Sequence, residues 1–132
     1  MSKFSHEKLN VYREGLKFIT WLSDLDSKGK IKGNILNQLD RASNSVVLNI
    51  AEGNGKYTSA DRCRFFDIAK GSAFECAAGL DILVAQGAVD KEEVLKGKEI
   101  LLNIVNMLVG LIRTNSDRVY EPEEEYKKFD QD

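Results

Sequence analysis

The 132-residue chain contains 42% hydrophobic and 30% charged residues and has a net charge of −2. This balance is typical of one soluble globular domain, and it excludes a disordered chain and the strongly basic composition of core ribosomal proteins. No run of about 18 apolar residues occurs and the N-terminus is polar, so we expect a cytoplasmic protein with no membrane segment or signal peptide.

Two amphipathic helices are predicted in the first half of the chain. The first covers 5–26, with Ser5 as its N-cap, because apolar residues recur there at spacings of three and four. Its predicted core face consists of Leu9, Tyr12, Leu16, Ile19 and Leu22, widened by Val11, Phe18, Trp21 and Leu25. The second covers 34–52, with Gly53 as its C-cap. Its predicted core face consists of Ile35, Leu39, Ala42, Val46 and Ile50.

Two longer helices are predicted in the second half. The third covers 60–86, and Thr58 with Asp61 resembles a capping box at its start. Its predicted core face consists of Phe66, Ala69, Ala73, Ala77, Leu80 and Val84. The fourth covers 91–115 and carries two neighbouring apolar stripes, one of Leu101, Val105, Leu108 and Ile112 and one of Ile100, Ile104, Met107 and Leu111.

Four amphipathic helices with short connections predict an all-α fold, an antiparallel up-down four-helix bundle. We expect this domain to cover 1–118 and the acidic segment 119–132 to form a flexible C-terminal tail. One stripe of the fourth helix can face the core, so the second stripe, together with Phe18 and Trp21, predicts an interface between copies of the chain. The alternative is one broad apolar face that serves a single core.

The sequence contains no pattern typical of a catalytic, cofactor or metal site. Its one histidine is His6, and no Glu-x-x-His or Cys-x-x-Cys pair occurs, which removes the di-iron and common zinc patterns. The glycine-rich segment after the second helix lacks two positions of a phosphate loop. Cys63 and Cys76 are separated by about 20 Å of helix, too far for a disulfide. We therefore predict a non-enzymatic protein without cofactors and with two reduced thiols.

Positive charge is concentrated in 28–70, where eight basic residues face four acidic ones, a net charge of +4. From 71 onward seven basic residues face thirteen acidic ones, a net charge of −6. Such a chain can present a basic surface to nucleic-acid phosphates despite its acidic total. The candidate contacts are Lys28, Lys30, Lys32, Lys56, Arg62, Arg64 and Lys70. The alternative is that these side chains belong to ordinary solvated helix faces and loops.

A ribbon of polar residues follows the second helix at spacings of three and four, and polar residues of the third helix match it. The set is Gln38, Arg41, Ser45, Asn49, Glu52, Ser72 and Glu75. An arginine held between packed helices needs a carboxylate partner, so we predict that Arg41 pairs with Glu75 while Asn49 and Ser72 complete the hydrogen bonds. The expected role is to fix helix register or a subunit contact. A ligand-binding or catalytic pocket, or simple solvent exposure, are the alternatives.

The segments Gln38–Ser45, Asn49–Gly53 and Arg64–Glu75, with the opening Leu9–Tyr12, carry a family resemblance. They resemble the bacterial four-helix-bundle proteins encoded in intervening sequences of large-subunit ribosomal RNA genes, which are sometimes labelled a ribosomal protein. The resemblance extends to about Arg113, with a departure at Cys76, where the family often has an acidic or bulkier residue. It implies a homopentameric, tapered barrel. It also implies kinship with the accessory variability protein of diversity-generating retroelements, a basic pentamer that binds nucleic acid and a reverse transcriptase.

Two hypotheses about function follow. The first is an oligomeric adaptor that binds RNA or DNA through the basic residues of 28–70. The second is a protein-interaction scaffold with no nucleic-acid role, which contacts a protein partner through the faces of the oligomer or the acidic tail. Self-association is common to both, and neither involves a membrane.

Overall fold

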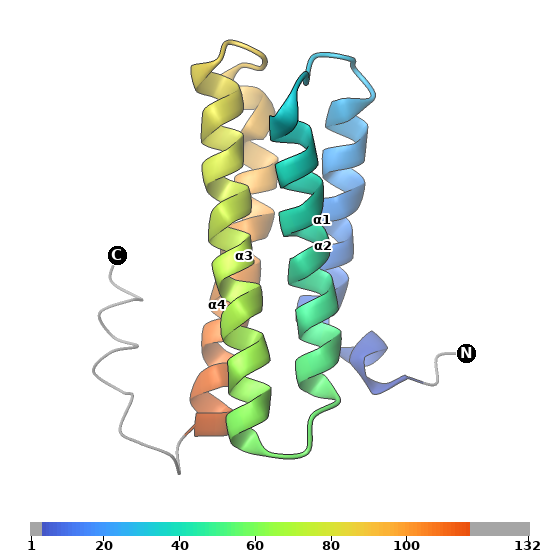
Figure 1. Cartoon of the computed structure of the whole chain (residues 1–132), viewed down its shortest axis with the longest axis vertical. Coiled ribbons are helices and arrows are strands. Elements are labelled where there is room, and N and C mark those ends of the chain that lie inside the picture. Colours follow the sequence, from blue (N-terminus) through green and yellow to red (C-terminus); the bar gives the residue numbers. More distant parts are fainter. Residues whose placement is uncertain (1–3, 117–132) are drawn as a thin grey trace.

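The computed structural model describes residues 4–116, which form four α-helices, two short 3₁₀ helices and no strand. The elements are η1 (Ser5–Lys8), α1 (Asn10–Asp26), α2 (Asn34–Asn54), α3 (Ser59–Ala85), η2 (Lys91–Val94) and α4 (Leu95–Ser116). Successive helices run in opposite directions, with the α1–α2 and α3–α4 connections at one end and the α2–α3 connection at the other (Figure 1). The predicted all-α class is confirmed, whereas the predicted tail lies outside the described residues.

The ends of the helices agree only partly with the predicted caps. The Thr58 hydroxyl accepts a hydrogen bond of 3.1 Å from the backbone N–H of Asp61, which confirms the cap of α3. Ser5 is not the N-cap of α1, because it begins η1 and its hydroxyl bonds to Asn54 instead. Gly53 is not a C-cap either. It is buried within α2, where a Cβ atom would come within 2.9 Å of the Phe66 ring, so the glycine permits close approach of α3.

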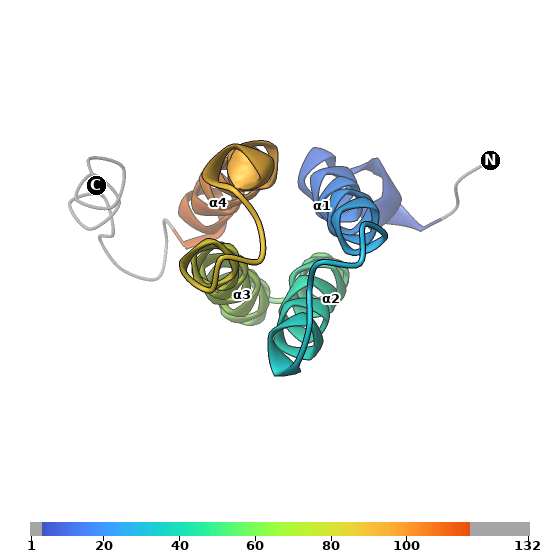
Figure 2. The same cartoon turned by 90° about the horizontal axis from the view of Figure 1, so that it is seen from above.

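The core runs along the axis of the four helices, with α4 next to α1 and α3, and α2 next to α1 and α3 (Figure 2). The most extensive packing joins α2 to α3, and the stripe predicted for α2 is buried throughout. The face of α1 differs from the prediction, because Leu16 is exposed and Phe18 is buried. Gly15 contacts Val47 of α2, and this close approach turns Leu16 outward.

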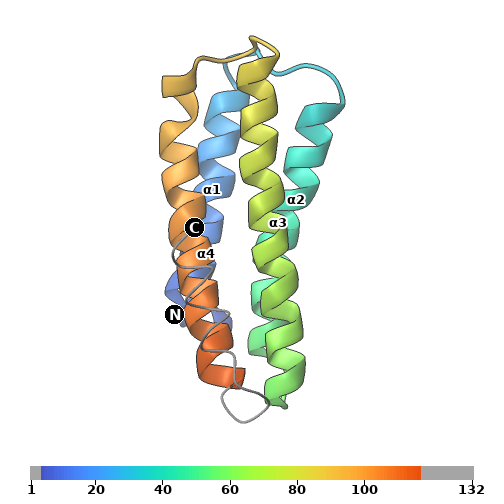
Figure 3. The same ribbon diagram turned by 90° about the vertical axis from the view of Figure 1, so that its left-hand side faces the viewer.

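Both apolar stripes of α4 contribute to the core, so the expectation that the second stripe stays exposed in a single copy is wrong, while self-association stays a prediction. Ile100 and Ile104 of the second stripe are as well buried as Leu101 and Leu108 of the first. The reason is the position of α4, which packs against α3 on one side and against α1 on the other (Figure 3). A single broad face therefore serves one core, which was the alternative expectation.

Candidate functional site

Within residues 4–116, no group of three or more His, Cys, Asp or Glu residues could hold a metal ion. His6 stacks on the Phe4 ring and meets the Tyr12 ring edge-on. Both cysteines are free thiols; burial raises the pKa of the Cys76 thiol to about 12 and also raises that of Cys63. Because the thiolate is the reactive form, neither cysteine is an activated nucleophile. None of the described helices is both long and apolar enough to span a membrane.

The seven basic residues singled out in the sequence do not form one surface. Lys28, Lys30 and Lys32 lie in the α1–α2 connection, whereas Lys56, Arg62 and Arg64 lie at or near the α2–α3 connection and Lys70 lies within α3. These two connections are at opposite ends of the bundle (Figure 1). A helix of 27 residues such as α3 is about 40 Å long, so a single short stretch of nucleic acid cannot contact both groups.

Two of the three lysines in the α1–α2 connection, Lys28 and Lys30, share one carboxylate. The Lys30 Nζ lies 2.9 Å and the Lys28 Nζ 3.9 Å from a carboxylate oxygen of Glu93 in η2. The backbone N–H of Asp90 and the Lys30 ammonium lower the pKa of Glu93, and the hydrogen bond to Glu93 raises the pKa of Lys30. Glu93 therefore joins the α1–α2 connection to the start of α4, and these lysines are best explained as parts of that structural contact.

At the opposite end Arg62 is also structural. Its half-buried guanidinium donates hydrogen bonds to the carbonyl oxygens of Asn54 (2.9 Å) and Lys56 (3.2 Å) and to Asn115 Oδ1 (3.1 Å). These bonds fasten the α2–α3 connection to α3 and α4. Arg62 is therefore unavailable to a phosphate, although nothing in the sequence distinguished it from Arg64.

Two cations and two aromatic rings remain at this end, and we call them the aromatic–cation cluster: Lys56, Tyr57, Arg64 and Phe65. The Lys56 Nζ lies 5.0 Å and the Arg64 Cζ 4.6 Å from the centroid of the Phe65 ring, within range for cation–π attraction. Tyr57 is 100% exposed. Neither aromatic residue is among the candidate contacts predicted from the sequence, because those candidates rest on positive charge alone.

The polar ribbon forms part of the predicted network. The Ser45 and Ser72 hydroxyls are 2.8 Å apart across the α2–α3 seam, and Asn49 Nδ2 donates to the Ser45 hydroxyl at 3.0 Å. The predicted ion pair between Arg41 and Glu75 is wrong, because both side chains are exposed and no ion pair joins them. Arg41 lies on the solvent side of α2, where water solvates the guanidinium and no carboxylate is required.

Exposed apolar residues flank this ribbon. Spacings of four, three and four place Arg41, Ser45, Leu48 and Glu52 along one side of α2, and Leu48 is 65% exposed. On α3, Ile68 and Ile82 are exposed at seven residues before and after Glu75. Gln38 and Glu75 line the same small pocket of about 90 Å³ between the two helices. We call this surface the α2–α3 face; its members are Gln38, Arg41, Ser45, Leu48, Asn49, Glu52, Ile68, Ser72, Glu75 and Ile82.

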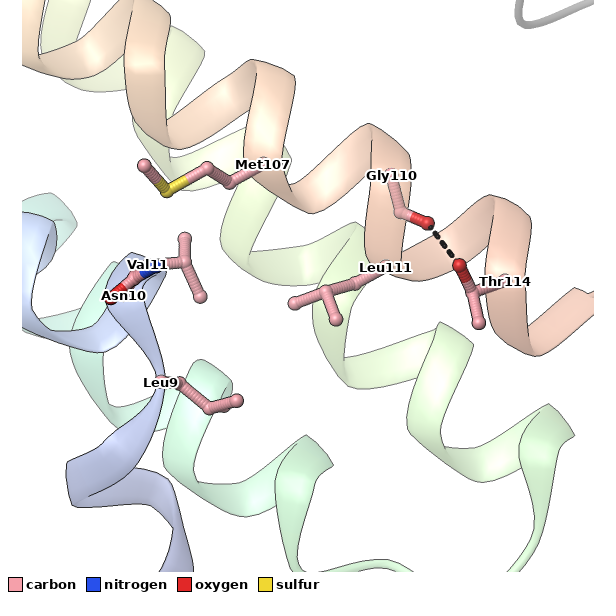
Figure 4. A pocket seen from close by; sticks show the side chains of 7 residues that line it. All are labelled: Leu9, Asn10, Val11, Met107, Gly110, Leu111 and Thr114. Atoms are coloured by element: carbon pink, nitrogen blue, oxygen red, sulfur yellow. Dashed lines mark hydrogen bonds between the residues drawn. The ribbon is translucent and has the colours of Figure 1, made fainter.

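A larger groove of about 420 Å³ separates the beginning of α1 from the end of α4 (Figure 4). The hydroxyl in its lining, that of Thr114, already donates to the Gly110 carbonyl oxygen at 2.9 Å. No titratable side chain from the described part of the chain lines the groove, so it offers a shape for an apolar group but no acid–base chemistry. Its lining consists of Leu9, Asn10, Val11, Met107, Gly110, Leu111 and Thr114.

Comparison with known proteins identifies relatives of this fold. A family model described as "23S rRNA-intervening sequence protein" matches residues 7–110. The crystal structure of a protein with unknown function from the S23 ribosomal protein family of Bacteroides thetaiotaomicron VPI-5482 superimposes with a TM-score of 0.71. The two chains are 21% identical, and the match covers 78% of this chain and 98% of that one, a likeness that shows the shared fold. No curated protein matches the chain.

Proposed function

Because the chain belongs to the 23S rRNA-intervening sequence protein family, we propose that it is a non-enzymatic, self-associating adaptor that binds nucleic acid. The observation that carries this proposal is the α2–α3 face, which combines exposed apolar side chains with Arg41 and Glu75. The family description adds a link to ribosomal RNA, which makes nucleic acid the first partner to test.

Self-association accounts for the composition of the α2–α3 face. Burying exposed apolar surface contributes about 25 cal/mol per Å², so covering Leu48, Ile68 and Ile82 with another copy is favourable. Arg41 and Glu75 carry opposite charges on the same face without an ion pair between them. In an oligomer, Arg41 of one copy can meet Glu75 of the next. A closed ring, of five copies as the family resemblance implies, also requires a second, different surface on each copy for this face to contact.

A ring also strengthens the binding of nucleic acid. Rotational symmetry places the same end of every bundle on the same side of the ring, so the α2–α3 connections of all copies face one way. A single copy offers little net positive charge there, because Glu52 and Asp61 lie beside Lys56 and Arg64. Several copies on one strand add their weak contacts through effective concentration.

The mass of the full chain in solution tests the self-association. Light scattering should give a multiple of the 14.8 kDa chain mass, and Leu48→Glu should reduce it towards one chain. Leu16→Glu is the matched control, because Leu16 is an exposed leucine of α1 outside the α2–α3 face. A wild-type monomer at about 100 μM, where even weak association of roughly −6 kcal/mol is detectable, contradicts the proposal.

The alternative function is a protein-interaction scaffold with no nucleic-acid role. The total charge of −2 and the apolar groove between α1 and α4 favour it. A pull-down with the intact protein that recovers a protein partner but no nucleic acid supports this alternative. An RNA or DNA partner that is lost on nuclease treatment supports the adaptor.

A further inference from the structure

The end of the bundle at the α2–α3 connection presents an aromatic ring that contacts almost nothing. Tyr57 is 100% exposed, yet the segment that carries it is well fastened. The Lys56 N–H donates to the Gly53 carbonyl oxygen, Arg62 holds the Asn54 and Lys56 carbonyl oxygens, and the Thr58 hydroxyl caps α3. The ring is therefore held outward on an ordered connection, with both of its faces free.

Two cations flank the same connection. The Lys56 Nζ and the Arg64 Cζ lie 5.0 and 4.6 Å from the centroid of the Phe65 ring. Both cations are therefore held at the connection that carries Tyr57. Their ion pairs, with Glu52 at 3.2 Å and Asp61 at 3.7 Å, involve carboxylates that are about half exposed. Exposed pairs of this kind contribute little stability, so a phosphate can replace either carboxylate at small cost.

We infer that the aromatic–cation cluster binds single-stranded nucleic acid, with Tyr57 stacking on a base and Lys56 and Arg64 contacting the flanking phosphates. This inference rests on the proposed adaptor function and specifies its ligand and site. Exposed aromatic rings combined with cations that contact the backbone are the means by which proteins hold unpaired bases without reading their sequence. Duplex nucleic acid fits poorly, because its bases are stacked on one another and offer no free face to Tyr57.

Their place beside aromatic residues distinguishes Lys56 and Arg64 from the other basic residues of the chain. The lysines of the α1–α2 connection lie in a segment without aromatic residues, and Lys28 and Lys30 share Glu93. Arg62 is occupied by the carbonyl oxygens of the α2–α3 connection. The inference therefore assigns binding to Lys56 and Arg64 and excludes Lys28, Lys30 and Arg62.

Fluorescence anisotropy with the full chain tests the site. The probe is a labelled 12-nucleotide single-stranded RNA at about 50 mM salt, compared with a 12-base-pair duplex RNA carrying the same label. We expect the single strand to bind more tightly. Tyr57→Ala should weaken it by about tenfold, in line with the loss of one base–aromatic stack, whereas Tyr57→Phe should retain it. Arg64→Ala should reduce the number of ions released on binding by about one, as measured from the salt dependence of the affinity.

Lys32→Ala is the matched control, because it removes an exposed cation at the opposite end of the bundle and should change the affinity less than twofold. Tyr57→Ala should also leave the thermal unfolding unchanged, since the side chain is fully exposed. Equal affinity of Tyr57→Ala and wild type, a preference for duplex, or equal binding of an acidic peptide overturns this inference alone. Failure of the wild type to bind any nucleic acid overturns the nucleic-acid part of the proposed function as well.

Discussion

The indole ring of Trp21 packs directly on Gly97, where a Cβ atom would lie only 2.4 Å from the ring. This contact brings α1 and α4 close together and half-buries a tryptophan that the sequence placed at an exposed edge. Gly97 lies in the first turn of α4, and its missing side chain allows the helix to cover the aromatic surface of Trp21.

Gly97→Ala should therefore destabilise the bundle, by about 1–3 kcal/mol as expected for overpacking at a tight contact. Gly110→Ala is the control in the same helix, because an added Cβ atom would meet nothing within 4 Å there and better helix propensity should stabilise the bundle by about 0.5–1 kcal/mol. Urea unfolding of the two variants measures the difference. Equal stabilisation by both substitutions would show that Trp21 does not pack on Gly97.

The two cysteines should differ in reactivity. Cys76 is buried and its pKa is raised to about 12, so at pH 8 it holds almost no thiolate in the folded protein. Cys63 is only half-buried, and burial raises its pKa as well. We expect iodoacetamide to modify Cys63 slowly and Cys76 only after unfolding in denaturant, as measured by mass spectrometry. Rapid modification of Cys76 in the native protein is incompatible with its place in the core.

Stability at acid pH should depend on Glu93. The Asp90 backbone N–H and Lys30 lower the pKa of Glu93 below its ordinary value of 4.5. A carboxyl group with a lowered pKa stabilises the folded state above pH 4.5, and this contribution is lost as the pH falls through the folded-state pKa. Glu93→Gln should remove that part of the acid dependence. Lys30→Met should raise the Glu93 pKa in an NMR titration, whereas Lys91→Met, which removes a neighbouring lysine without an ion pair to Glu93, should change it less.

Charge reversal tests whether Arg41 and Glu75 meet across copies. Arg41→Glu and Glu75→Arg should each lower the mass of the oligomer, because each places like charges in the same contact. The double variant restores opposite charges and should recover the wild-type mass. A double variant that is no better associated than either single one would separate these residues from the interface.

The sequence was sufficient to predict the buried face of a helix where one main apolar stripe follows that helix. All five residues predicted for the core of α2, from Ile35 to Ile50, are buried, because they follow one face of that helix at spacings of three and four. On α1, apolar residues occupy several faces, so spacing alone could not decide between Leu16 and Phe18. The two stripes of α4 required knowledge of its neighbours, since their burial depends on its position between α1 and α3.

The candidate site was less predictable for a similar reason. Seven basic residues are equivalent in sequence, and only the folded chain shows that Arg62 binds two carbonyl oxygens while Arg64 remains exposed. Helical spacing predicted that Ser45, Asn49 and Ser72 belong to one polar network, but it did not predict the bond between Ser45 and Ser72 or the position of Arg41 on the solvent side of α2. The exposure of Tyr57 could have been predicted from the sequence. An aromatic residue beside a lysine in a glycine-containing connection indicates a ring that cannot reach the core.

The most direct test of the proposed adaptor function is the mass of the native particle, isolated from its own cells with and without nuclease treatment. We predict an oligomer, a multiple of the 14.8 kDa chain, that carries nucleic acid, and nuclease should remove the nucleic acid while leaving the protein oligomer intact. A single chain without nucleic acid in both preparations would contradict the central claim.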